Sequence, residues 1–165
     1  MTDRTDATAT PADTALLIDA MCGGLRSVLR MAGYDAAYAL ERGVEADEAV
    51  RELAERESRT LITRDRSLAA AAADAVLLQS RDVDEQLAEL EAAGFALDLG
   101  EPRRCSACNG TLDPVPPGDE TPAYAPDSDE AACARCRSCG RVYWKGSHWE
   151  DVADRLAAIR RDHSA

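Results

Sequence analysis

The sequence is poor in lysine and aromatic residues, and it contains no long apolar run. Lys145 is the single lysine among 19 basic residues, and the aromatic residues are two tryptophans, four tyrosines and one phenylalanine. No apolar run approaches the roughly 20 residues that cross a bilayer. The first residues also lack the basic start and apolar segment of a signal peptide. We therefore expect a cytoplasmic protein that does not associate with membranes.

Acidic residues dominate the charge, with 31 acidic against 19 basic side chains and a formal net charge of −12. A basic stripe is the usual footprint of nucleic-acid binding, so the chain as a whole does not fit that class. Residues 1–100 hold 10 basic and 20 acidic side chains, whereas residues 101–150 hold 6 and 8, which makes the second part less acidic. An acid-rich, lysine-poor surface favours a halophilic protein, and maximal stability at low salt would contradict that hypothesis.

The length and the composition along the chain predict one main domain with a small module. A chain of 165 residues can bury one core but not two full-sized ones. Residues 1–13 are rich in Thr, Ala and Asp without an apolar period, so we expect a disordered tail. We assign residues 14–100 to the main domain, 101–150 to a metal-binding module and 151–165 to a C-terminal helix.

Short apolar runs alternate with helical patterns through the main domain. Leu25, Val28, Leu29 and Ala32 recur at helical spacing before Gly33, and Asp47 is placed to cap the next helix. The expected strands cover 15–18, 35–40, 60–63 and 75–78, and the expected helices start near 25, 47, 67 and 82. Such alternation predicts an α/β fold, a parallel sheet flanked by helices.

Three aspartates follow the ends of these strands. Asp19 and Asp65 come after the first and third apolar runs, and Asp47 begins the helix after the second. Parallel strands place their carboxyl ends at one edge of the sheet, so the three carboxylates can converge there. Mg²⁺ or Mn²⁺ would neutralise them and activate water for hydrolysis of a phosphate ester. In the alternative interpretation Asp47 is only a helix cap and the other two are turn residues.

Five of the six cysteines lie between positions 105 and 139. Paired C-x-x-C spacings favour a metal site over disulfides. Cys105 with Cys108, and Cys136 with Cys139, each form a knuckle followed by a turn-forming glycine, and Zn²⁺ prefers four such thiolates in a structural site. The 27 residues between the two pairs include five prolines, so we expect an extended excursion.

The remaining cysteines and histidines leave alternatives open. Cys133 also forms a C-x-x-C pair with Cys136, but Gly140 follows Cys139 as a knuckle requires, so we interpret Cys133 as a spare thiol. His148 could bind zinc or lie in solvent. Cys22 is expected to be a core residue, because a catalytic thiol needs a base and the two histidines lie far along the chain.

Aromatic and basic residues gather after the second knuckle. Tyr143, Trp144 and Trp149 can stack on unpaired bases, while Arg141 and Lys145 can bind phosphates. Arg141, Trp144, Lys145 and Trp149 are therefore candidate RNA contacts. The alternative is that the rings form the minimal core of the module.

Several segments resemble the Mut7-C family, a PIN-like RNase domain followed by a zinc ribbon. The similar segments are 16–25, 46–48, 61–66, the cysteine pairs and Val142-Tyr-Trp-Lys-Gly-Ser-His-Trp149, which is the most specific. The resemblance spans residues 16–152. It places the second cysteine pair directly before the Gly-x-Val-Tyr-Trp segment, in agreement with Cys136 and Cys139.

The resemblance implies metal-dependent cleavage of RNA. It carries the PIN acids onto Asp19, Asp47 and Asp65, with Glu48 as a possible substitute for Asp47 and either Asp82 or Asp84 as a fourth acid. We expect a divalent-metal ribonuclease whose zinc ribbon positions RNA. The alternatives are a non-catalytic RNA-binding or interaction module and a toxin-type RNase.

Overall fold

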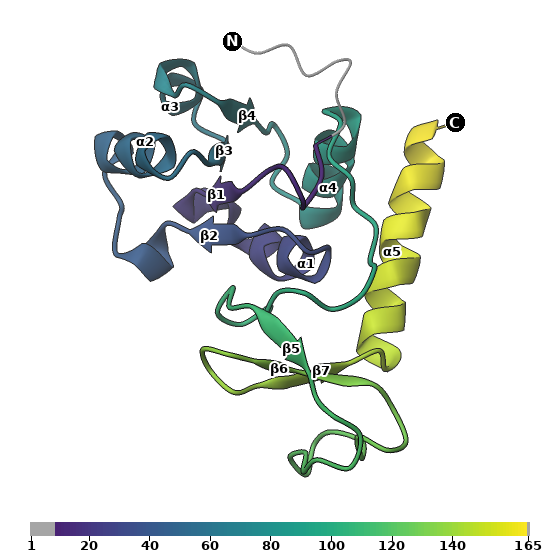
Figure 1. Ribbon diagram of the computed structural model, residues 1–165. Helices are drawn as coiled ribbons and strands as arrows, with labels where there is room; N and C mark the ends of the chain where they lie inside the picture. Colours follow the sequence, from purple (N-terminus) through teal and green to yellow (C-terminus); the bar gives the residue numbers. More distant parts are fainter. Residues whose placement is uncertain (1–8, 165) are drawn as a thin grey trace.

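The computed structural model describes residues 9–164, and within that range the main sheet has four parallel strands (Figure 1). Their order across the sheet is β2-β1-β3-β4. The strands are β1 (Leu16–Ile18), β2 (Ala36–Tyr38), β3 (Thr60–Thr63) and β4 (Ala75–Leu77). The predicted α/β class is confirmed, and each strand lies inside the run predicted for it.

Helices cover both faces of this sheet. On β1, Leu16 and Ile18 point into a core with α1, α4 and α5, whereas Leu17 points into a second core with α2 and α3 (Figure 1). Strand side chains alternate between faces, so a wholly apolar strand supplies both cores. The helices are η1 (Ala20–Leu25), α1 (Arg26–Met31), η2 (Leu40–Arg42), α2 (Asp47–Arg56), α3 (Arg66–Ala71), α4 (Val83–Ala92) and α5 (Ser147–Ser164).

Asp47 does not cap α2, contrary to the sequence prediction. The N-cap is Ala46, whose carbonyl accepts from Val50 N at 2.9 Å, and no side chain makes a capping hydrogen bond there. Asp47 is instead the first helical residue, where the positive end of the helix dipole favours a carboxylate.

The chain is ordered before the predicted start of the domain at Thr14. Residues 1–8 of the predicted disordered tail lie outside the described residues. Ala9 is buried, donates to Gly94 O at 2.7 Å and accepts from Ala96 N at 2.8 Å. Without these two hydrogen bonds the backbone N–H and C=O of Ala9 would be buried and unpaired, which is costly. The two bonds therefore hold this polar stretch against the domain.

A second, antiparallel sheet forms the zinc-ribbon module. It consists of β5 (Leu112–Pro114), β6 (Cys133–Cys136) and β7 (Val142–Trp144), with β6 in the centre. The proline-rich excursion between β5 and β6 is organised by Ser128, whose hydroxyl accepts from Gly118 N at 3.0 Å and donates to Asp119 O at 2.7 Å.

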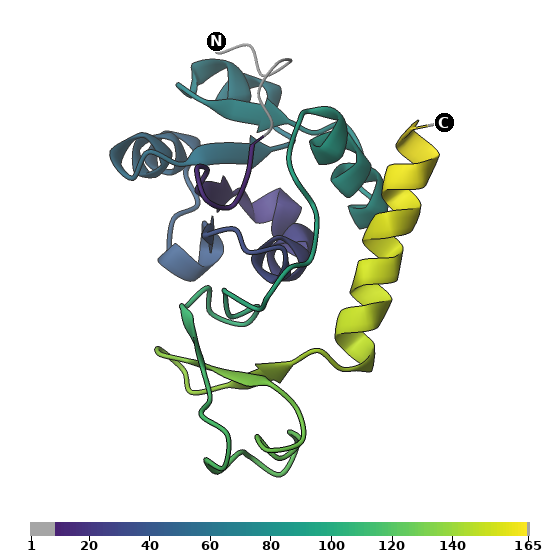
Figure 2. The ribbon, with the colours of Figure 1, turned by 45° about the vertical axis from the view of Figure 1, so that its right-hand side comes forward.

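The last helix returns from the ribbon to the main domain and runs beside α4 (Figure 2). Val152 and Leu156 lie in the main core, and Arg155 pairs with Asp84 of α4. Arg160 donates to Leu97 O at 3.1 Å. The ribbon is therefore inserted between two helices of the α/β domain and joined to it at both ends.

Candidate functional site

Asp19 is held rigidly where β1 ends. The residue is only 6% exposed, and its Oδ1 accepts a hydrogen bond from Ala20 N at 2.8 Å. Oδ2 accepts from the buried Thr63 hydroxyl at 2.7 Å. Each carboxylate oxygen accepts one of these hydrogen bonds and keeps a second lone pair. The carboxylate is therefore oriented but can still bind a further partner.

Asp65 lies just beyond the end of strand β3 and hydrogen-bonds to the same threonine. Its backbone N donates to Thr63 Oγ1 at 3.0 Å, and its Oδ1 accepts from Leu68 N at 3.0 Å to cap α3. Thr63 therefore links the backbone of Asp65 to the carboxylate of Asp19. Asp19 and Asp65 thus follow neighbouring strands at the carboxyl edge of the sheet and share one threonine, through a carboxylate in the first case and a backbone N–H in the second.

Asp47 lies apart from that link. It is exposed at the start of α2 and lines a shallow surface pocket with Glu48, Ser67 and Leu68. Among residues 9–164, the only group of three or more potential ligand atoms within 4.8 Å of one another is made by four cysteines. The structure thus places Asp47 across from the start of α3 but does not gather all three carboxylates into one such group.

The acids considered as a fourth ligand have other partners. Asp82 caps α4 by accepting from Glu85 N at 3.1 Å, and Asp84 pairs with Arg155. Glu89, which sequence reasoning missed, accepts from Gln79 N at 3.1 Å just beyond β4.

Cys22 lies close to these acids but is not suited to act as a thiolate. Burial, followed by the charge of Asp19 and a smaller contribution from Glu89, raises the pKa of its thiol to about 12, although Arg64 opposes the shift. The residue is 1% exposed and packs in the main core. The interpretation of Cys22 as a core residue agrees with this environment.

The four predicted cysteines form a cluster in the ribbon that is able to hold a metal ion. Cys105 and Cys139 have sulfurs 3.7 Å apart, those of Cys108 and Cys136 are 3.5 Å apart, and all four lie within 4.8 Å of one another. Four sulfurs bound at about 2.3 Å to one tetrahedral Zn²⁺ would lie about 3.8 Å apart. The cluster therefore has the ligands and spacing of a structural zinc site.

Backbone N–H groups prepare one ligand to be a thiolate. The sulfur of Cys136 accepts from Ser138 N at 3.4 Å and from Cys139 N at 3.5 Å. Burial opposes ionisation of this thiol, but the backbone hydrogen bonds from Cys139 and Ser138, together with those from the Cys108 and Cys139 side chains, lower its pKa to about 7. Thiolate is the form that binds zinc.

Cys133 and His148 stand outside the cluster. Cys133 is buried among Val115 and Val142, and its sulfur lies 3.5 Å from Ala131 O. His148 is exposed at the start of α5. The choice of the later cysteine pair agrees with the cluster that the structure forms.

The first knuckle, Cys105–Gly110, contacts the edge strand β2 directly. Asn109 Oδ1 accepts from Ala36 N at 2.9 Å, and Asn109 Nδ2 donates to Asp35 Oδ1 at 2.7 Å. Arg30 is 1% exposed and donates to Ala36 O at 3.0 Å and to Ser106 O at 3.2 Å. The knuckle and the α/β domain therefore share hydrogen bonds along the outer side of β2.

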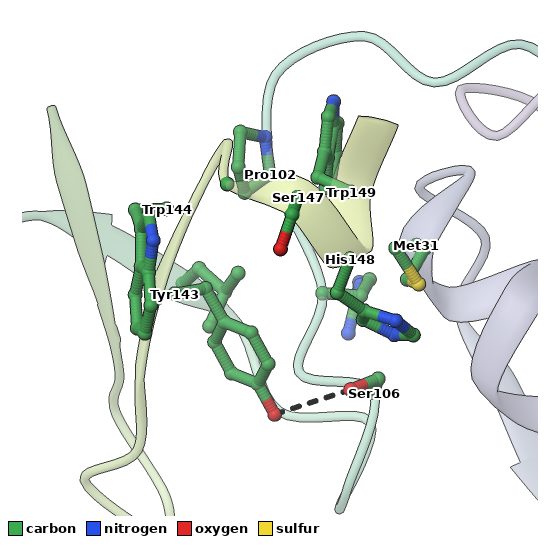
Figure 3. A pocket seen from close by; sticks show the side chains of 11 residues that line it. Met31, Pro102, Ser106, Tyr143, Trp144, Ser147, His148 and Trp149 are labelled. Atoms are coloured by element: carbon green, nitrogen blue, oxygen red, sulfur yellow. Dashed lines mark hydrogen bonds between the residues drawn. The ribbon is translucent and has the colours of Figure 1, made fainter. Parts of the chain in front are cut away.

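The candidate RNA contacts divide into two groups. Trp144 and Trp149 line a pocket together with Tyr143 and His148 (Figure 3). The Tyr143 hydroxyl accepts from the Ser106 hydroxyl (Figure 3). It also lies 3.0 Å from the sulfur of Cys105. Each of the three rings is partly buried against a core cluster, so the rings support the module and also line the pocket.

The two basic candidates lie on the surface. Lys145 pairs with Glu101 at 2.8 Å and has its Nζ 6.0 Å from the ring centroid of Trp149. Arg141 is exposed, and it is not among the residues that line the pocket. Lys145 is therefore the basic candidate that lies beside one of the pocket rings.

Residues 14–156 match a protein-family model described as the Mut7-C RNAse domain. The chain belongs to the Mut7-C RNase family. The Mut7-C match covers the sheet, the ribbon and the first part of α5. No curated protein and no solved structure matches the chain. Among the described residues of this Mut7-C chain, no helix combines the length and apolar character that crossing a membrane requires.

Proposed function

We propose that this Mut7-C chain hydrolyses RNA phosphodiester bonds with the help of a divalent cation, Mg²⁺ or Mn²⁺, bound at the carboxyl edge of the main sheet. The family is an RNase family, and RNA is the substrate that it implies. The observation that carries the proposal is the link through Thr63 between Asp19 and Asp65. It ties the Asp19 carboxylate and the Asp65 backbone, at the ends of neighbouring strands, to one threonine at the edge where open α/β sheets bind ligands.

The donor chemistry of these residues suits a hard cation. Mg²⁺ and Mn²⁺ prefer carboxylate oxygens. Asp65 Oδ1 caps α3, and no hydrogen bond is formed by its Oδ2 within residues 9–164. Asp19 and Asp65 would hold the ion, which when bound lowers the pKa of a water molecule and stabilises charge on the phosphate.

Asp47 is proposed as the third carboxylate of the site. It lies across from the start of α3, beside Ser67 and Leu68. Mg²⁺ usually keeps several of its waters, so Asp47 can act on the ion through one of them. Thr63 holds Asp19 in position, and the capping bond from Leu68 holds Asp65.

The ribbon is proposed to bind zinc and to position RNA. Four thiolates leave zinc no open place for water, so the hydrolytic chemistry is assigned to the aspartates. Trp144 and Trp149, with Lys145 between them in the sequence and Arg141 before them, are the proposed RNA contacts. The ring faces lie partly open at the pocket rather than wholly inside a core.

A cleavage assay with matched aspartate variants tests this function. End-labelled RNA is incubated with Mg²⁺ or Mn²⁺ and either the wild-type protein, Asp65→Asn, or the control Asp129→Asn, which changes an exposed acid of the ribbon excursion. We expect Asp65→Asn to lose about 100-fold or more in rate, while the control retains the wild-type rate. Equal cleavage by all three proteins would identify a contaminating nuclease, and RNA binding without cleavage would indicate a non-catalytic RNA-binding module.

A further inference from the structure

A pocket of about 190 Å³ lies where the ribbon meets the end of α1 and the start of α5. The lining residues come from several elements. Met31 ends α1, Arg104 directly precedes the first knuckle, and Ser106 lies in it. Trp144 belongs to β7 and His148 to α5. Sites for drug-sized ligands usually measure about 300–1,000 Å³. This pocket is smaller and suits a single planar ring system.

Trp144 offers a flat, supported face to the pocket. The ring of Tyr124 stacks on it, with centroids 6.2 Å apart and planes at 28°. Tyr124 is not among the lining residues, so it supports Trp144 from outside the pocket. In Figure 3 Trp144 is seen edge-on, with one face turned toward Tyr143 and Ser147.

The opposite side of the pocket is formed by His148 and Met31 (Figure 3). His148 points toward Met31, and the Tyr143 ring and Ser147 lie between that side and Trp144. Exposed imidazole and indole rings stack on the π-faces of nucleobases, and hydroxyl groups such as that of Ser147 can bond to base edges. The arrangement is a slot between two surfaces that can stack.

The charge at the pocket differs from that of the rest of the chain. The chain has 31 acidic residues, yet the described residues that line the pocket include no Asp or Glu, while they include Arg104. The first turn of the 18-residue helix α5 borders the pocket and contributes a partial positive charge, although Glu150 in the same turn, which does not line the pocket, opposes it. The site therefore favours a ligand that carries negative charge next to its ring.

We propose that this pocket binds one unpaired base of single-stranded RNA, with an adjacent phosphate directed toward Arg104 and the start of α5. The proposal rests on the proposed function in taking RNA as the substrate. A ring between stacking surfaces, together with a basic group for the backbone, is the pattern by which proteins hold single strands. A paired base in a duplex cannot enter a slot closed by side chains on both sides.

The pocket lies away from the proposed catalytic aspartates. Met31 ends the segment formed by η1 and α1, whereas Asp19 directly precedes its start. The six residues of α1 alone span about 9 Å, and η1, which is kinked at Cys22, lies between α1 and Asp19, so the bound base is placed away from the scissile bond. The pocket therefore anchors the strand, and its loss raises KM while kcat is retained.

Tryptophan fluorescence reports occupancy of this pocket directly. The chain contains two tryptophans, and both Trp144 and Trp149 line the pocket. The full-length Asp65→Asn protein is titrated with a short single-stranded RNA and with the same RNA annealed to its complement. We expect saturable quenching by the single strand and at least tenfold weaker binding of the duplex. Equal quenching by both, or no quenching by the single strand, would overturn the proposal.

Variants of the pocket test the assignment. His148→Ala removes an exposed side chain from one wall and is expected to weaken binding of the single strand about tenfold. The control is Arg137→Ala, which removes an exposed ribbon residue that pairs with Asp113 outside the pocket. Circular dichroism and zinc content verify that both variants are folded. If folded His148→Ala bound the single strand with unchanged affinity, the proposal that this pocket binds a base would be contradicted.

The binding and cleavage experiments can fail separately. Quenching requires no hydrolysis, so a protein that is quenched by single strands but cleaves no RNA retains the pocket and loses the proposed catalytic function. Cleavage by the wild-type protein without any fluorescence response would support the catalytic function and overturn the base-binding pocket. In the active protein, His148→Ala is expected to raise KM about tenfold with unchanged kcat, and a fall in kcat alone would contradict an anchoring role.

Discussion

Thr63 and Asp19 share a buried hydrogen bond of 2.7 Å, although 44 residues separate them in the chain. The same hydroxyl accepts from the backbone of Asp65. A single threonine therefore orients one proposed catalytic acid and holds the backbone of the other. Few other side chains could replace it, because the position requires a donor and an acceptor in a space with no exposure.

Thr63→Val removes this hydroxyl while it keeps the shape of the side chain. We expect a loss of about 1–3 kcal/mol in the free energy of unfolding, because Asp19 loses a donor and the Asp65 N–H loses its acceptor. RNA cleavage should fall about 10- to 100-fold, as is usual when a residue that orients a metal ligand is lost. Urea denaturation and the cleavage assay measure the two effects. The exposed Thr111→Val serves as the control, and an equal effect of both substitutions would refute the role of Thr63.

Gly110→Ala is expected to disrupt the zinc site. A Cβ at this position would lie 2.6 Å from the sulfur of Cys136 and 2.9 Å from the Ser138 hydroxyl. The ligand must move, so the variant should release zinc to a competing chelator faster than the wild-type protein does. Gly100→Ala is the matched control, because a Cβ there meets nothing within 4 Å. Equal rates of zinc release from the two variants would show that the knuckle tolerates the methyl group.

Asn109→Gly isolates the contact between the knuckle and β2. Asn109 has a φ of 70°, a left-handed conformation that glycine adopts without strain. The variant therefore removes the bonds to Ala36 N and Asp35 but retains the turn. We expect a loss of about 1–3 kcal/mol in unfolding free energy measured in urea, mostly from the unpaired Ala36 N–H. A stability within about 0.5 kcal/mol of the wild-type value would mean that water replaces the side chain.

Glu57 makes stability depend on pH in the acidic range. Hydrogen bonds from Arg42, and then from Arg59, lower the pKa of its carboxyl from the usual 4.5 to about 2. Because the folded state holds the proton less tightly than the unfolded state does, the stabilisation is complete above about pH 4.5 and is lost as the pH falls toward 2. Glu57→Gln should therefore be less stable than the wild-type protein at pH 6, with a difference that shrinks toward pH 3. Thermal unfolding of both proteins across this range tests the sign, and a difference that grows on acidification would contradict it.

Local patterns were sufficient to predict most of the fold. Leu16–Ile18 and Thr60–Thr63 are short apolar or β-branched runs, each followed within two residues by an aspartate, and each forms a strand buried on both faces. The four-cysteine cluster was also predictable, because two C-x-x-C pairs encode the ligand chemistry and most of the geometry of such a site.

Contacts between distant segments could not be predicted in the same way. Arg30 follows the apolar Leu29 in a helix and gives no local sign of burial, since its partners Ala36 and Ser106 come from other elements. Glu89 approaches Cys22 only because α4 packs beside η1. Asp47 was predicted as a cap from residue preference alone, but the hydrogen-bonding of the helix starts one residue earlier, at Ala46.

The contact of Asn109 with Ala36 means that the four-cysteine module covers part of a sheet edge. β2 is an edge strand, and an uncovered edge is a template for strand addition by another molecule. The zinc knuckle occupies the outward N–H of Ala36 with a side chain, and Arg30 occupies its carbonyl. A chain stripped of zinc would present this edge to its neighbours, so loss of the metal should lead to self-association of the sheet as well as to unfolding of the ribbon.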